Sequence, residues 1–226
     1  MSIQNETTAP NVKAFATDLE YLTAEFAWVQ ARTKRIEADQ LAMNQAPALE
    51  KMQSGRMRGV YADVAAGMTD QLAREEQAIR QEIDARMAVN RAVGPKLGLD
   101  RLCREHWLGQ FERAALLLAT IPCIGYSMME THVTPLRPWY RSTTIDAGIV
   151  SLFLELDMKG CLDGLLCLLP EAPLRMDGLV ALTYEPSTPA SALDAGFELT
   201  GKTLADITGI SAFEWFTDSG EIPDVE

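Results

Sequence analysis

The sequence lacks an apolar run long enough to cross a membrane. No stretch of about 18 uncharged apolar residues occurs in its 226 residues, and a membrane-spanning helix needs about 20. The amino terminus, Met-Ser-Ile-Gln-Asn-Glu, also has neither the basic nor the apolar region of a secretory signal. The sequence therefore predicts a cytoplasmic protein that has no membrane partner.

Cysteine and histidine are scarce as well, with four and two residues respectively. The cysteines (Cys103, Cys123, Cys161 and Cys167) lie in apolar or helical contexts, which is typical of free thiols in a reducing compartment. Cys103 and His106 can share one helical face, but zinc takes four ligands and no second pair follows at metal spacing. Neither Cys161 nor Cys167 has a histidine nearby in the sequence to activate it. We therefore expect no metal site and no catalytic residue.

Basic residues are few in the second half of the chain. Residues 1–113 carry 15 Lys or Arg against 16 Asp or Glu, whereas residues 114–226 carry 5 against 16. From Thr203 onward there are six acidic residues and no basic one, and residues 213–226 are expected to form an acidic tail. Proteins bind nucleic acids mainly by neutralising phosphates, so nucleic acid is an unlikely partner for this half.

The first 93 residues predict a long helical hairpin. Apolar residues recur at steps of three and four between Val12 and Ile36, which predicts a helix reaching about Met43. Proline and glycines interrupt residues 44–61, and a second amphipathic helix is expected over residues 64–92. Two interpretations of the first helix remain open. It packs antiparallel on the second helix, or its heptad seam pairs with another copy to form a homo-oligomer.

Beyond Gly94-Pro95 the elements become shorter and more apolar. Helices and strands are expected in the order of a winged helix-turn-helix: helices at 97–107, 110–121, 126–134, 143–156 and 161–169, strands at 178–184 and 197–199, and a last helix at 201–208. The expected fold is mainly α, with a helical hairpin at 1–93, a winged-helix-like α+β domain with a small β-wing at 94–212, and the acidic tail.

One octapeptide, Gly196–Thr203, matches the phosphate-loop consensus through Gly196, Gly201, Lys202 and Thr203. Such a loop requires a buried strand before it and a later strand that carries a magnesium-supporting Asp. Two prolines precede the octapeptide and little chain follows it. We therefore interpret it as a junction between a strand and a helix capped by Thr200, and expect no cofactor there; a nucleotide-binding protein is the less favoured alternative.

The sequence has one aromatic and basic cluster, formed by Arg137, Trp139, Tyr140 and Arg141. In a winged helix it would precede a recognition helix at 143–156, so DNA binding is one interpretation. That helix has no Lys, Arg, Asn or Gln to read base edges. Aromatic and arginine residues are also enriched at the centres of protein interfaces. The four residues are therefore candidate contacts for a protein partner.

Residues 94–210 resemble the N-terminal region of bacterial AAA+ ATPases associated with extracellular contractile injection systems. The matching segments are Phe111-Glu112-Arg113, Leu116–Leu118, Ala172–Leu179 and Phe197–Leu199. The resemblance implies a non-catalytic adaptor or regulatory domain that docks a protein partner or substrate and helps to assemble an oligomer. ATP and magnesium would then bind only in a downstream ATPase domain. The alternative is a free-standing winged-helix regulator that binds DNA.

Overall fold

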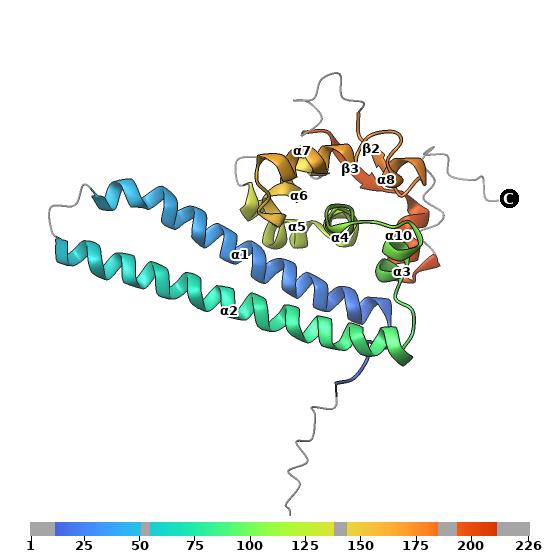
Figure 1. The fold of residues 1–226 in the computed structure, drawn as a ribbon, viewed down its shortest axis with the longest axis horizontal. Helices are drawn as coiled ribbons and strands as arrows, with labels where there is room; N and C mark the ends of the chain where they lie inside the picture. Colours follow the sequence, from blue (N-terminus) through green and yellow to red (C-terminus); the bar gives the residue numbers. More distant parts are fainter. Residues whose placement is uncertain (1–11, 51–54, 138–143, 185–193, 212–226) are drawn as a thin grey trace, which may run out of the picture.

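The computed structural model describes residues 12–50, 55–137, 144–184 and 194–211, and shows a helical hairpin beside a smaller body of short helices and one sheet (Figure 1). The hairpin consists of α1 (Asp18–Glu50) and α2 (Gly55–Val93). The body contains α3 (Gly98–Glu105), α4 (Gln110–Ile124), α5 (Tyr126–His132), η1 (Thr134–Leu136), β1 (Ile145–Asp146), α6 (Ala147–Leu154), α7 (Met158–Leu166), α8 (Pro173–Met176), β2 (Val180–Leu182), β3 (Gly196–Leu199) and α10 (Gly201–Thr208). Among the described helices, none combines the length and apolar character that a membrane crossing requires.

The body has the topology of a winged helix. Its three short strands form an antiparallel sheet in the order β1-β3-β2, in which β3 lies at the centre. In the register, Phe197 of β3 faces Ile145 of β1 on one side and Leu182 of β2 on the other. Along the chain, α4 is followed by β1, by the helices α6 and α7, and by the strands β2 and β3; α5 and η1 are inserted after α4, and α8 is inserted after α7. This order is that of a helix-turn-helix followed by a wing.

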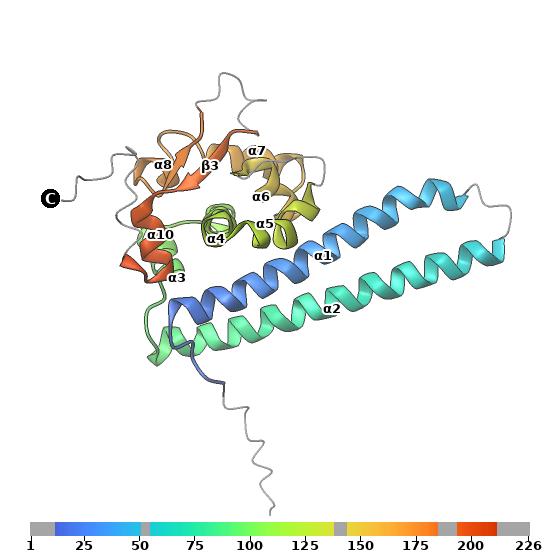
Figure 2. The ribbon, with the colours of Figure 1, turned by 180° about the vertical axis from the view of Figure 1, so that it is seen from behind.

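A single apolar core joins the hairpin to the body. Helix α4 is apolar nearly all round, and its residues from Ala114 to Ile121 are all buried, as expected for a helix at the centre of a domain. One side of α1 contributes Leu22 and Val29 to the same cluster, together with Phe15 just before the helix, and all three are fully buried. Figures 1 and 2 show α1 lying between α2 and the body from both sides.

The expected fold class is confirmed: a mainly helical chain with a long hairpin, followed by a winged-helix α+β domain with a small sheet. The last helix also has the expected ends. The hydroxyl of Thr200 accepts a hydrogen bond from the Thr203 N–H at 3.3 Å, and Gly209 ends the helix with a φ of 71°. That left-handed conformation is one that glycine adopts without strain.

Several expected helix boundaries are wrong. Helix α1 continues to Glu50 and α2 begins at Gly55, inside the connection expected at 44–61, and α7 spans Met158–Leu166 instead of 161–169. Pro122 does not end α4, which continues to Ile124 with the proline inside it. The helix expected at 143–156 is a two-residue strand followed by the shorter α6. The Asp146 carboxylate caps α6 by accepting the Ile149 N–H at 2.8 Å. Asp146 thus ends a strand and caps a helix. The apolar periodicity of the sequence does not distinguish a short strand followed by a helix from one longer helix.

Candidate functional site

Helices α6 and α7 form the helix-turn-helix, and residues 155–157 form its turn. Helix α6 ends at Leu154, and its C-cap Glu155 has a left-handed backbone with a φ of 55°. Asp157 is the N-cap of α7, and its carboxylate accepts the Gly160 N–H at 2.8 Å. Side-chain acceptors of this kind satisfy a helix N-terminus that has no intrahelical partner. The second helix of the motif, which inserts into the major groove in DNA-binding members of this architecture, is therefore α7.

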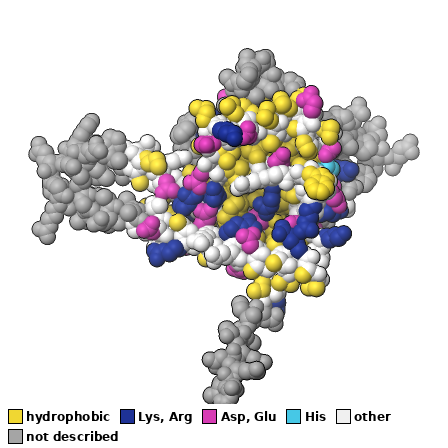
Figure 3. All heavy atoms as spheres, viewed as in Figure 1, with side chains coloured by type: hydrophobic (Ala, Val, Ile, Leu, Met, Phe, Trp, Pro, Cys, Tyr) yellow, Lys and Arg dark blue, Asp and Glu magenta, His cyan; other side chains and the backbone are white. Residues whose placement is uncertain are grey.

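One face of α7 is apolar and open to solvent. Met158, Leu162 and Leu166 are 79%, 55% and 59% exposed, and Leu169 just beyond the helix is 47% exposed. Steps of four residues place the first three side chains on one helical face. We call these four residues the α7 stripe. Hydrophobic side chains gather over this upper part of the body in Figure 3.

Few charges accompany the α7 stripe. Lys159 and Asp163 are exposed on α7 and cancel one another in charge, and Asp157 adds one negative charge at the helix start. The helix sequence, Met-Lys-Gly-Cys-Leu-Asp-Gly-Leu-Leu, contains no Arg, Asn or Gln, the residues that with Lys make most base-specific contacts. The exposed surface of α7 is therefore better suited to apolar contacts with a partner than to hydrogen bonds with base edges.

Helix α1 holds the turn in front of α7. The Arg32 guanidinium donates to the Phe153 carbonyl at 2.6 Å through Nε and to the Glu155 carboxylate at 2.9 Å through Nη2. Arg35 also binds Glu155, and this hydrogen bond lowers the pKa of the Glu155 carboxyl. Glu76 of α2 accepts from both arginines at 2.6 Å. Five groups from three helices thus fix the end of α6.

A second ionic cluster lies nearer the start of α1. Glu25 is completely buried, and its carboxylate accepts from Arg113 of α4 at 2.6 Å and from Arg80 of α2 at 3.1 Å. Arg113 also donates to the Tyr21 hydroxyl at 2.8 Å. Burial raises the pKa of Tyr21, so this hydroxyl stays neutral. A buried carboxylate needs such partners, and they tie α1 to both of its neighbours.

The predicted aromatic and basic cluster is described only at Arg137. Its guanidinium binds the buried carboxylate of Asp146 at 3.0 Å and the exposed carboxylate of Asp194 at 3.1 Å. Burial raises the pKa of Asp146, while the Ile149 N–H and Arg137 oppose this change. Arg137 therefore joins the start of α6 to the chain entering β3. Trp139, Tyr140 and Arg141 lie outside the described residues.

The residues of the phosphate-loop consensus do not lie in a loop. Gly196 is the first residue of the central strand, and a Cβ there would meet the Thr144 hydroxyl at 2.4 Å. Gly201 and Lys202 lie in the first turn of α10, where Lys202 is exposed, and Thr203 is buried with its hydroxyl against Thr200 at 2.9 Å. A phosphate loop cradles its ligand with the backbone of the residues between the two consensus glycines. Here Phe197, Glu198 and Leu199 lie in β3, which pairs with β1 and β2.

The cysteines and histidines of the described chain are dispersed. No three side chains among Cys, His, Asp and Glu gather as metal ligands in the part of the chain that the structure describes. Cys103 and His106, the two potential ligands on one helix, have different surroundings. His106 binds Asp177 at 2.6 Å, while Cys103 packs against the core. Burial raises the pKa of the Cys103 thiol to about 11 and that of Cys167 to about 12. Both thiols are thus poor nucleophiles.

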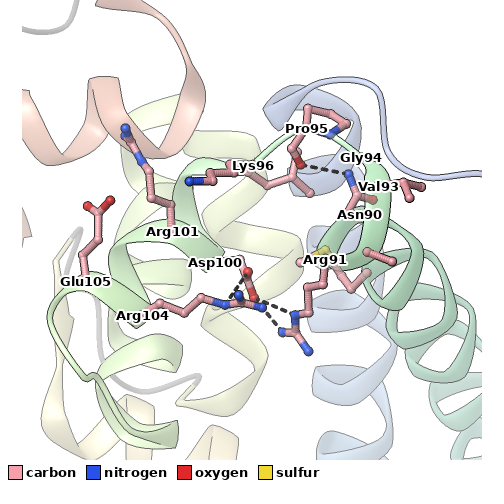
Figure 4. A pocket seen from close by; sticks show the side chains of 13 residues that line it. Asn90, Arg91, Val93, Gly94, Pro95, Lys96, Asp100, Arg101, Arg104 and Glu105 are labelled. Atoms are coloured by element: carbon pink, nitrogen blue, oxygen red, sulfur yellow. Dashed lines mark hydrogen bonds and ion pairs between the residues drawn. The ribbon is translucent and has the colours of Figure 1, made fainter.

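A recess lies where α2 ends and α3 begins (Figure 4). It has a volume of about 270 Å³ and is lined by four basic residues, Arg91, Lys96, Arg101 and Arg104, together with Asp100 and Glu105. We call it the basic recess. Arg91 and Arg104 converge on the same Asp100 carboxylate, at 2.6 and 3.0 Å, while Lys96 and Arg101 extend toward α10.

Neither the α7 stripe nor the basic recess is among the sites expected from the sequence. The sequence does contain a pattern for the α7 stripe, because Met158, Leu162 and Leu166 recur at steps of four. A buried helix has the same spacing, so the pattern does not show that the face is exposed. No sequence pattern indicates the basic recess, because Arg91 and Arg104 meet only through the packing of α3 beside the end of α2.

Comparison with known proteins agrees with this topology. No curated protein sequence and no solved structure shows significant similarity to the chain. Residues 4–214 match the family model described as a winged helix domain, variant. The match includes the hairpin as well as the sheet, and it covers nearly the whole sequence. The chain therefore belongs to the variant winged helix domain family.

Proposed function

We propose that this chain is a non-catalytic adaptor domain that docks a protein partner through the α7 stripe. The observation that carries the proposal is the composition of α7, which has three exposed apolar side chains where a DNA-reading helix has polar ones. Single exposed apolar residues are ordinary, but a contiguous apolar face marks an interaction site. The resemblance to the N-terminal regions of AAA+ ATPases supports a place ahead of such a motor.

The surroundings of the α7 stripe define the chemistry of the partner. Exposed carboxylates of Asp157, Asp163 and Glu171 lie in or beside the helix, with Lys159 as the neighbouring cation. The second half of the chain has 11 more acidic than basic residues, since 16 acidic residues face 5 basic ones. A complementary partner presents an apolar groove flanked by Lys or Arg. Met158 and the leucines would supply the buried centre of the interface.

Site-specific photocrosslinking tests the proposal whatever the identity of the partner. A benzophenone amino acid replaces Leu162 in cells that express the full chain, and a second variant carries it at Leu19, a 58% exposed apolar residue of α1. We expect a discrete protein adduct from position 162 and none of the same mass from position 19. Adducts with DNA at position 162, or identical adducts at both positions, would refute docking through α7.

DNA binding remains the second candidate, because the chain has a complete helix-turn-helix and belongs to a winged helix family. Fluorescence anisotropy with a labelled duplex at about 0.05 M salt tests it, since phosphate contacts are strongest at low salt. Binding that disappears in Arg141→Ala, and remains in the surface control Arg74→Ala, would favour this candidate. Isothermal titration with ATP and magnesium, using Lys202→Ala as the comparison, tests the nucleotide alternative in the same preparation.

A further inference from the structure

The basic recess continues toward the point where the described chain ends. A neighbouring recess, also about 270 Å³, shares Lys96 and Arg101 with it and is lined as well by Asp206, Gly209 and Ser211. Ser211 is the last described residue of the carboxyl-terminal segment. The chain thus leaves α10 beside two of the four cations of the basic recess.

The cations of the basic recess have N–H groups to spare. Lys96 is exposed and has no hydrogen bond or ion pair within the described ranges, which end at Ser211. Arg91 and Arg104 share one carboxylate, so two positive charges face a single negative one. Arg101 binds Asp206, yet its Nε is buried without a partner among the described atoms. A buried donor of this kind costs free energy until an acceptor reaches it.

The recess also contains carboxylates that limit what it can bind. Asp100 and Glu105 line it, and Asp18 and Asp206 line the neighbouring recess. A phosphate polymer would meet these charges as well as the net charge of −12 on the whole chain. A short peptide with spaced carboxylates can instead place each acid against a separate arginine or lysine.

A peptide of this composition follows Ser211 in the sequence. Residues 212–226 contain five acidic residues and no basic one: Glu214, Asp218, Glu221, Asp224 and Glu226. Three aromatic residues, Phe213, Trp215 and Phe216, come first. Fifteen residues can span about 50 Å when extended, which exceeds the width of a recess beside their point of attachment. The family match ends at residue 214, so most of this segment lies beyond the shared domain.

We propose that the acidic segment 212–226 binds the basic recess of its own chain. Its carboxylates pair with Lys96, Arg91 and Arg104. The recess is then an acidic-peptide site that the chain fills itself. This proposal is independent of the α7 stripe, which lies on a different helix and has a different chemistry.

Zero-length crosslinking of the full chain tests the proposal. A carbodiimide joins a lysine amine to a carboxylate only when the two groups touch, and mass spectrometry locates the resulting amide. We expect crosslinks from segment 212–226 to Lys96 at least tenfold more abundant than crosslinks to Lys159, an exposed lysine on α7. They should fall severalfold at about 0.5 M salt, because screening weakens exposed ion pairs. An even distribution over both lysines would overturn the proposal.

Two further experiments show which chain supplies the bound segment and which residues of the basic recess contact it. An equal mixture of isotopically light and heavy chains should give crosslinks within one isotope only, and mixed crosslinks would assign the recess to the tail of a second copy instead. Arg91→Ala with Arg104→Ala should reduce the Lys96 crosslinks at least fivefold, while Arg74→Ala, on the exposed side of α2, should leave them unchanged. Equal crosslinking in the two variants would exclude the arginines as partners of the segment.

Discussion

Arg32 and Glu155 are 123 residues apart in the sequence, and their side chains meet at 2.9 Å. Arg32 belongs to the hairpin, whereas Glu155 is the left-handed residue that begins the turn before α7. Glu76 completes the contact by accepting hydrogen bonds from both Arg32 and Arg35. The hairpin and the helix-turn-helix are therefore joined by a mostly buried ionic cluster.

Removing the shared acceptor should destabilise this junction. Glu76 is only 8% exposed, and Glu76→Ala leaves two arginines with Glu155 as their remaining common partner. We expect the free energy of unfolding to fall by about 2 kcal/mol, the usual cost of leaving part-buried charged donors without an acceptor. Glu75→Ala is the matched control, because Glu75 is exposed and should change stability by less than about 0.5 kcal/mol. Urea denaturation of both variants measures the difference, and equal effects would contradict a structural role for Glu76.

Trp107 should be replaceable by glycine with a gain in stability. It is 91% exposed and has a φ of 54°, at the position after α3 where glycine is most common. A side chain in this conformation costs about 1–2 kcal/mol, and Trp107 recovers little of that cost by burial. We expect Trp107→Gly to raise the free energy of unfolding by up to about 1 kcal/mol, because the greater freedom of glycine in the unfolded chain offsets part of the gain.

Trp107→Ala separates backbone strain from the loss of the indole ring. Alanine keeps the Cβ that makes the left-handed conformation unfavourable, so this variant should not be stabilised. Thermal unfolding of the two variants and the original chain gives the comparison. A glycine variant that is less stable than the alanine variant would show that strain at position 107 is not released.

Gly164 should not tolerate a methyl group. A Cβ at this position would lie 2.4 Å from Cε2 of Phe111, which packs against α7 from α4. Gly164→Ala should therefore destabilise the chain by about 1–3 kcal/mol through overpacking. Gly67→Ala in α2 is the opposite case, because nothing lies within 4 Å of its added Cβ. It should stabilise by about 0.5–1 kcal/mol through helix propensity, and chemical denaturation of both variants checks the two signs.

Stability should decrease in mild acid because of His132. Burial lowers the pKa of His132 from its ordinary value of 6.5, despite the hydrogen bond of its ring to the Met128 carbonyl. As the pH falls below 6.5, the unfolded chain therefore takes up the proton before the folded chain does, and the stability contributed by neutral His132 is lost. Denaturation between about pH 7 and pH 5 should show a steeper decline for the original chain than for His132→Gln. Parallel declines would assign the pH dependence to other groups.

The sequence is sufficient to predict the class of fold, because the features that define it are local. Thr200 and Gly209 bound a helix as their types require, and the hairpin follows from apolar spacing. The position of the helix-turn-helix is less accessible. In the sequence, Asp146 and Glu155 fit within one continuous helix. Only the pairing of Ile145 with Phe197 shows that a strand precedes α6.

The candidate site was less predictable than the fold, for a physical reason. Met158, Leu162 and Leu166 have the spacing of a buried helical face, and periodicity alone cannot say whether another element covers that face. Among the described residues, the structure leaves these three side chains largely open to solvent. The ionic partners of Glu155 lie about 120 residues away in the sequence, so no local pattern indicates them.

The hairpin extends well beyond the body in Figure 1. Helix α1 has 33 residues, which corresponds to a rod of about 50 Å, and Arg32 and Arg35 lie near its middle. The middle of the rod is therefore tied to the turn at Glu155 by two guanidinium groups, so the helix-turn-helix is anchored to the hairpin at half the length of α1.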